Sequence, residues 1–108
     1  MAMETRLKEA HLICRRGMLV QEQADGTFLT GYWLIKPEHI REGVVFALHE
    51  SKAAQSYLQG EVVRLTNIRT DRTPSGRHQR RVEVLVRKSR TPLSWKGGGT
   101  GEKGLVWG

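Results

Sequence analysis

The chain has 108 residues, 38% of them hydrophobic and 27% charged, which is enough for one folded domain and too few for two. Cys14 is the only cysteine, which excludes an intrachain disulfide and a cysteine-based zinc site, and the four histidines lack zinc-site spacing. No apolar run approaches a membrane span, and Met1–Arg6 lack the apolar core of a signal peptide. We therefore expect a cytoplasmic protein without a metal or cofactor.

The net charge of +7 is unevenly distributed along the chain. Residues 1–63 contain seven Lys and Arg against eight Asp and Glu, whereas residues 64–108 contain eleven against three. The first part therefore carries −1 and the second +8. Such a basic half favours a polyanionic partner, most often nucleic acid. The alternative is a solvated basic surface that aids solubility.

The first third of the chain predicts short strands. Residues 5–16 are compatible with a short helix or with a strand that begins near Leu12. Residues 18–23 and 27–35 flank Asp25-Gly26, a pair typical of a hairpin turn. Pro37 ends the second arm, and residues 37–41 fit one helical turn with proline at its first position.

Residues 44–49 form the central predicted strand, with Val44, Phe46 and Leu48 on one face and Val45, Ala47 and His49 on the other. Residues 50–59 predict a loop or a short helix. Two long strands follow at 60–69 and 79–88, and the Pro-Ser-Gly content of the segment between them predicts a turn. In the second long strand, Val82, Val84 and Val86 alternate with charged residues and indicate one buried face.

We predict a mainly β fold with one or two short helices, arranged as a small barrel or curled sheet. Residues 1–108 form a single domain, on which residues 1–30 pack as an extension or hairpin. Residues 94–108 are expected as a glycine-rich loop with a short apolar end. Segment 96–104 lacks the Gly-Lys-Ser/Thr of a phosphate-binding loop, which excludes a nucleotide triphosphatase but leaves a flap possible.

Three short motifs resemble the EVE branch of the PUA-like superfamily in their order and spacing. They are the run Tyr32-Trp33-Leu34, the strand from Gly43 through Phe46 that ends in His49-Glu50-Ser51, and the run Gly60-Glu61-Val62-Val63. The resemblance covers residues 31–93. It implies a PUA-like pseudo-barrel with a pocket for a modified base, between aromatic side chains and the end of the Phe46 strand.

The predicted base pocket consists of four residues. Trp33 and Trp95 are the stacking candidates, although a tryptophan in a small core is equally ordinary. His49 and Ser51 both donate and accept hydrogen bonds and are suited to reading a base edge; the alternative is a hydrogen-bonded strand end. Trp107, next to the C-terminus, is assigned to packing.

The predicted phosphate-binding residues lie after the central strand and along the basic hairpin: Lys52, Arg72, Arg77, Arg80, Arg81, Arg87, Lys88 and Arg90. Together these features favour a non-enzymatic nucleic-acid-binding module that reads a modified DNA or RNA base. Two alternatives stay open. One is a small hydrolase of modified nucleosides, as in the ASCH branch of the same superfamily, and the other is an adaptor that docks an acidic protein.

Overall fold

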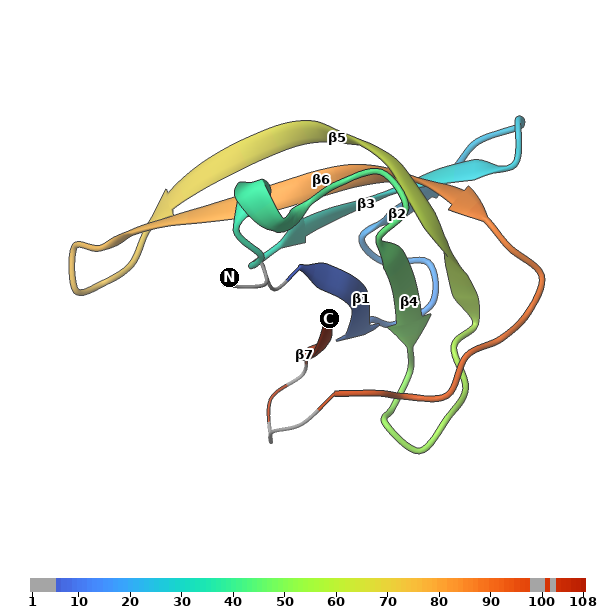
Figure 1. The fold of residues 1–108 in the computed structure, drawn as a ribbon. Coiled ribbons are helices and arrows are strands. Elements are labelled where there is room, and N and C mark those ends of the chain that lie inside the picture. The colour runs from blue at the N-terminus through green and yellow to red at the C-terminus, as the bar shows by residue number, and fades with distance from the viewer. Residues whose placement is uncertain (1–5, 98–100, 102) are drawn as a thin grey trace, which may run out of the picture.

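The computed structural model of the protein describes residues 6–97, 101 and 103–108 (Figure 1). Its strands form one seven-stranded sheet in the order β2-β3-β6-β5-β4-β1-β7. Their bounds are β1 Leu7–Ile13, β2 Val20–Glu22, β3 Thr27–Trp33, β4 Val45–His49, β5 Leu58–Arg72, β6 His78–Lys88 and β7 Lys103–Trp107. The mainly β prediction is confirmed, with one 3₁₀ turn, η1 at Pro37–His39, as the helical element of the described residues.

The ambiguous segment near the N-terminus is a strand in the interior of the sheet. β1 pairs in parallel with β4, so that Ala10 lies opposite Phe46 and Leu12 opposite Leu48. These four side chains lie on one face of the sheet and are fully buried or nearly so, because they belong to the hydrophobic core. Residues 7–30 therefore contribute the interior strand β1, together with β2 and the first part of β3.

The hairpin predicted around Asp25-Gly26 is confirmed. β2 and β3 are antiparallel, and Gly26 has a φ of 84°, in the left-handed region that glycine adopts without steric cost. The Asp25 carboxylate accepts hydrogen bonds from the backbone N–H and the hydroxyl of Thr27. The turn is thus fixed by its own sequence.

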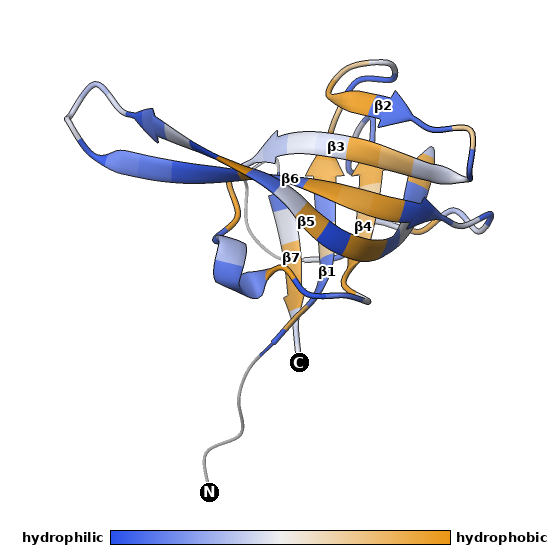
Figure 2. Ribbon diagram, turned by 90° about the horizontal axis from the view of Figure 1, so that it is seen from above, coloured by the Kyte–Doolittle hydropathy of each residue, from blue (hydrophilic) through white to orange (hydrophobic). Residues whose placement is uncertain are grey.

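β5 and β6 form a long antiparallel hairpin that projects from the body of the molecule (Figure 1). Val82, Val84 and Val86 are completely buried, as their alternation predicts. Figure 2 shows the contrast along this hairpin: apolar residues gather where it crosses the body, and hydrophilic residues occupy the projecting end. The hydrophobic core thus covers one end of the hairpin only.

The sheet curls so that its two edge regions approach each other. β7 is an edge strand, and its Lys103 Nζ donates a 2.7 Å hydrogen bond to the carbonyl oxygen of Leu34, which directly follows β3. The short apolar end expected after the glycine-rich segment belongs to β7, which pairs with β1 and begins at Lys103, two residues inside the segment expected as a loop. Part of the proposed flap, residues 98–100 and 102, lies outside the described residues.

Residues 50–57 form turns and a loop, so the loop alternative for this region is confirmed. Among the residues that the structure describes, no helix is long and apolar enough to cross a membrane.

Candidate nucleic-acid interface

A cleft of about 550 Å³ lies where η1, the first residues of β6 and β7 meet. Its lining combines apolar and basic side chains: Leu34, Ile35, Leu105 and Trp107 with Lys36, His39, His78, Arg80 and Lys103, beside the polar Gln79. The volume falls in the range of small-molecule sites, about 300–1,000 Å³. An apolar lining with cationic groups beside it suits a flat ring that carries a phosphate.

Trp107 presents an accessible aromatic surface in this cleft. Its exposed fraction is 41%, and its ring meets the His39 imidazole nearly perpendicularly, with centroids 4.8 Å apart and an interplanar angle of 81°. Such an edge-to-face contact orients the indole. Leu34, exposed to 37%, supplies a second accessible apolar side chain.

Lys103 joins the two sides of the cleft. Its ammonium is half-buried and donates to the Leu34 carbonyl oxygen at 2.7 Å. Burial, followed by the positive charge of Arg81, lowers the pKa of Lys103. An anion bound in the cleft would offset both effects, because it restores a favourable partner for the ammonium.

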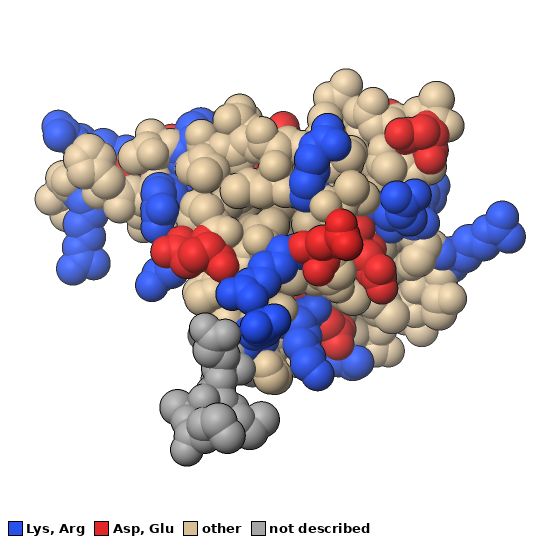
Figure 3. Space-filling view, turned by 45° about the horizontal axis from the view of Figure 1, so that its top comes forward, with Lys and Arg blue, Asp and Glu red and all other residues tan. Residues whose placement is uncertain are grey.

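Basic side chains continue from the cleft onto the projecting hairpin, at the left of Figure 3. Arg80 lies at the junction, where its guanidinium contacts the Glu38 carboxylate of η1 at 3.1 Å. Further out, the Asp71 carboxylate lies between two guanidinium groups, 3.1 Å from Arg69 and 3.2 Å from Arg81. Arg72 and Arg77 are exposed at the tip.

The structure divides the predicted phosphate-binding residues into separate groups. Arg72, Arg77, Arg80 and Arg81 lie on the projecting half of the hairpin, whereas Arg87 and Lys88 lie at the other end of β6, followed by Arg90. Arg81 and Arg87, the nearest members of the two groups, are separated by about 20 Å along β6, so the two groups do not form one short contact surface. Lys88 is paired with Glu22 at 3.0 Å. Lys52 lies elsewhere, with Nζ 5.5 Å from the centroid of the Trp95 ring.

The predicted base pocket is only half assembled. Trp95 packs beside His49, with ring centroids 5.1 Å apart. Trp33 packs instead against the core beside Val82, where its Nε1 donates to the Thr30 hydroxyl at 2.9 Å. Ser51 is exposed in the loop after β4. The two indoles therefore have different surroundings, and the prediction that they sandwich one base is wrong.

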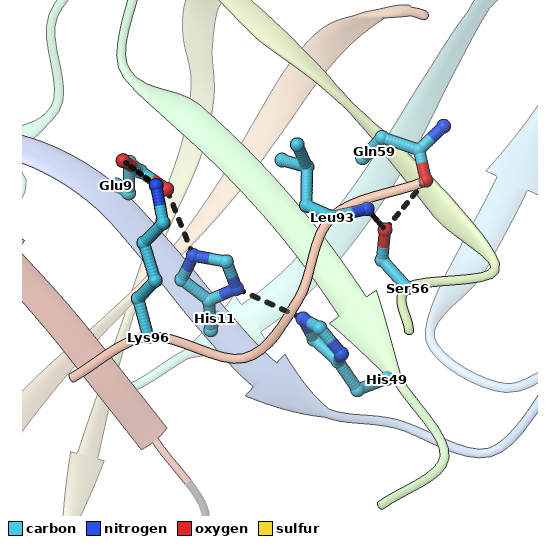
Figure 4. A network of polar contacts seen from close by, with 7 residues as sticks. All are labelled: Glu9, His11, His49, Ser56, Gln59, Leu93 and Lys96. Carbon is cyan, nitrogen blue, oxygen red and sulfur yellow. Dashed lines mark hydrogen bonds and ion pairs between the residues drawn. The ribbon is translucent and has the colours of Figure 1, made fainter. Parts of the chain in front are cut away.

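His49 is completely buried and hydrogen-bonded, which matches the alternative of a hydrogen-bonded strand end for this residue. Its Nδ1 lies 2.9 Å from the Ala54 carbonyl oxygen. Its Nε2 lies 2.8 Å from Nδ1 of His11 (Figure 4). His11 Nε2 in turn lies 2.9 Å from a Glu9 carboxylate oxygen. Because both ring nitrogens of His49 are occupied, it has no free group for reading a base edge.

Electrostatics in this network follow from burial. Burial lowers the pKa of His49, and the charge of His11 acts in the same direction, although the hydrogen bond to Ala54 opposes them. For Glu9, burial by itself raises the pKa of the carboxyl. The hydrogen bond from His11 and the charges of Lys96 and His11 outweigh that effect, so the net change is a lowered pKa.

A segment that we call the strap, residues 89–97, covers this network. Leu93 and Ser56 exchange two hydrogen bonds of 2.8 Å, one from the Ser56 backbone N–H to the Leu93 carbonyl and one from the Leu93 N–H to the Ser56 hydroxyl. That hydroxyl also donates to Gln59 at 2.6 Å (Figure 4). The ring of Trp95 completes the cover over His11 and His49. The strap explains why His49 is buried.

The sequence patterns did not reveal Trp107, Leu34, His39 and Lys103 as members of one site. They come from four separate places in the chain, and only the curl of the sheet brings them together. The sequence patterns also did not reveal the network of Glu9, His11 and His49. The one available signal is the Glu-x-His spacing, which on a strand places both side chains on one face.

No family model, curated protein or solved structure matches the chain. The resemblance to the EVE branch therefore stays a prediction. The cleft and the hairpin are the features on which a functional proposal rests.

Proposed function

We propose that the chain is a non-enzymatic nucleic-acid-binding protein in which an unpaired or extruded base enters the cleft and packs against Trp107. The basic side chains of the projecting hairpin then contact the phosphate backbone. The observation that carries the proposal is the position of an accessible indole in a cleft continuous with an arginine-bearing hairpin.

Physical chemistry supports this assignment of roles. An aromatic platform contributes about 1–3 kcal/mol per stacked base and tolerates any base, since every base has a π-face. Guanidinium groups contact phosphates as forks and position a strand without reading its sequence. Extruding a paired base costs a few kcal/mol, so single strands and weakened or modified sites are preferred.

We propose that the recognised base is a modified one and that it binds in the Trp107 cleft, not between Trp33 and Trp95. Polar groups of the lining, such as Gln79 and the imidazoles of His39 and His78, can hydrogen-bond a base edge. A cytoplasmic location belongs to the same proposal. It accords with a lone, buried thiol at Cys14.

A panel of modified and unmodified oligonucleotides, single- and double-stranded, tests the proposal at two salt concentrations. We expect tighter binding of single strands or of one modified duplex, with affinity falling as salt rises. The exposed Met18, outside both the cleft and the hairpin, provides the control variant Met18→Ala. Equal affinity for every member, unchanged in Trp107→Ala, would overturn the cleft model and leave a basic surface suited to acidic proteins as well.

A further inference from the structure

The geometry of the buried network of Glu9, His11 and His49 determines how many protons its hydrogen bonds need. The network runs from one acceptor, the Ala54 carbonyl oxygen, to another, the Glu9 carboxylate, through three hydrogen bonds. A hydrogen bond between two such nitrogen or oxygen atoms needs one proton, so three protons are required. Two neutral imidazoles supply one proton each, which is one too few.

The position of each proton follows step by step from the acceptor ends. Since a carbonyl cannot donate, His49 Nδ1 carries a proton, and His49 Nε2 then accepts from His11 Nδ1. The remaining contact, between His11 Nε2 and Glu9, is satisfied by a third proton. The pKa of Glu9 is lowered, so its carboxylate is ionised and can only accept. The third hydrogen bond therefore forms only when His11 Nε2 also carries a proton.

We propose that this network is a proton-dependent latch, in which one proton held by the His11–His49 pair fastens the strap over the sheet. With the proton present, all three hydrogen bonds form. When it is lost, a lone pair of His11 Nε2 faces the Glu9 carboxylate and one link disappears. When a second proton is added, two N–H groups face each other between the rings and the central link disappears.

The strap responds because it contacts the network through two side chains. Lys96 Nζ lies 3.4 Å from the second Glu9 oxygen, and the Trp95 ring lies 5.9 Å from the ring of His11 and 5.1 Å from that of His49, measured between centroids. A Cβ atom at Gly104 would lie 3.0 Å from the Trp95 ring, so the absence of a side chain on β7 makes room for the indole.

The charged groups around the pair come from each neighbouring element. β1 supplies Glu9, the strap supplies Lys96, and the loop after β4 supplies Lys52, which lies over Trp95. Two further charged groups on neighbouring segments have other partners. Glu50 forms an ion pair with Arg16, and Lys103 of β7 donates a hydrogen bond to the Leu34 carbonyl oxygen. The Glu9 carboxylate is therefore the anion in contact with the pair among the described residues, and it determines whether the extra proton is retained.

Glu9→Gln is the decisive variant. The side-chain amide can donate to His11 Nε2, so three protons are then supplied without an imidazolium, at nearly unchanged size. Glu50→Gln removes a carboxylate from an exposed ion pair and controls for the change in net charge. Neither substitution alters a residue of the cleft or of the hairpin.

Histidine ring ¹⁵N spectra and amide hydrogen exchange of Leu93 and Ser56 test the latch. At pH 7 we expect one ring of the buried pair to be doubly protonated in the wild type and in Glu50→Gln, and both rings to be neutral in Glu9→Gln. As pH rises above the ordinary histidine range near 6.5, toward the higher pH at which the latched pair itself loses its proton, protection of Leu93 should fall by up to about tenfold per pH unit in the wild type and then level off. It should not do so in Glu9→Gln.

Two neutral rings in the wild type at pH 7, or identical pH dependence of Leu93 protection in wild type and Glu9→Gln, would overturn the latch. Both measurements are made without nucleic acid, so their outcome is independent of the proposed binding function. A Glu9→Gln protein that fails to fold would also contradict the proposal, because the amide is expected to satisfy the network.

Discussion

Gly104 lies directly opposite His11 in the register of β7 on β1. The same short strand carries Lys103, Leu105 and Trp107, which line the cleft. Successive residues of β7 face opposite sides of the sheet, so Gly104 lies on the side of the histidine network and Lys103, Leu105 and Trp107 lie on the side of the cleft. A change in how β7 is held against β1 is therefore expected to reach the cleft within two or three residues.

Trp107→Ala should weaken binding of a single-stranded oligonucleotide by about 1–3 kcal/mol, or roughly 5- to 150-fold, because the base then has no stacking platform. Trp107→Phe should retain most of the affinity, since an aromatic face persists. Fluorescence anisotropy titrations measure both. Equal decreases in the two variants would point to a disturbed β7 instead of missing stacking.

Replacing Arg72 and Arg77 together by glutamine should weaken binding of single strands regardless of base. It should also reduce the slope of log affinity against log salt by about 0.7 for each phosphate that the protein no longer neutralises. Both residues are exposed at the hairpin tip. Arg16→Gln, at an exposed position on the turn after β1, removes a charge elsewhere and should leave the slope unchanged. If the wild type, the double variant and Arg16→Gln all showed the same slope of log affinity against log salt, the hairpin tip would not contact the phosphates.

Ser56→Ala should destabilise the fold by about 1–3 kcal/mol, because the half-buried Leu93 N–H loses its acceptor and the buried Gln59 loses a donor. For a domain of this size the melting temperature should fall by about 4 °C or more. Ser51→Ala is the matched control, since Ser51 is exposed, and should have no measurable effect. Thermal unfolding followed by circular dichroism provides the comparison.

Stability should fall in acid, in two stages. Burial lowers the pKa of His49 below its ordinary value of 6.5, so the unfolded chain takes up a proton first, and stability decreases as pH falls below that value. Glu9, whose pKa is lowered from 4.5, adds a further loss as pH falls through its lowered value. Urea unfolding between pH 6.5 and pH 3 measures the decline. His78→Gln, at an exposed position, should show the same curve, and a flat wild-type curve would contradict the assignment.

Local features of this protein were predictable because their physical causes are local. Asp25-Gly26 requires a left-handed turn, and the valines at 82, 84 and 86 alternate with charges because one face of β6 packs on the core. Pro37 begins a helical turn for a similar reason, since its ring presets φ. In each case the residues that decide the outcome are within a few positions of one another.

The sites depended on long-range pairing, which no short stretch of sequence specifies. His11 and His49 are 38 residues apart and meet only because β1 and β4 are parallel neighbours. Trp107 reaches Leu34 and Arg80 only because the sheet curls.

By itself, then, the sequence determined a basic, mainly β protein with an arginine-bearing hairpin, through composition, turn chemistry and alternation. The tertiary structure alone decided which indole is accessible and which histidine is enclosed. The physical reason is that burial depends on what packs over a residue, and here the covering element, the strap, lies some 40 residues further along the chain than His49.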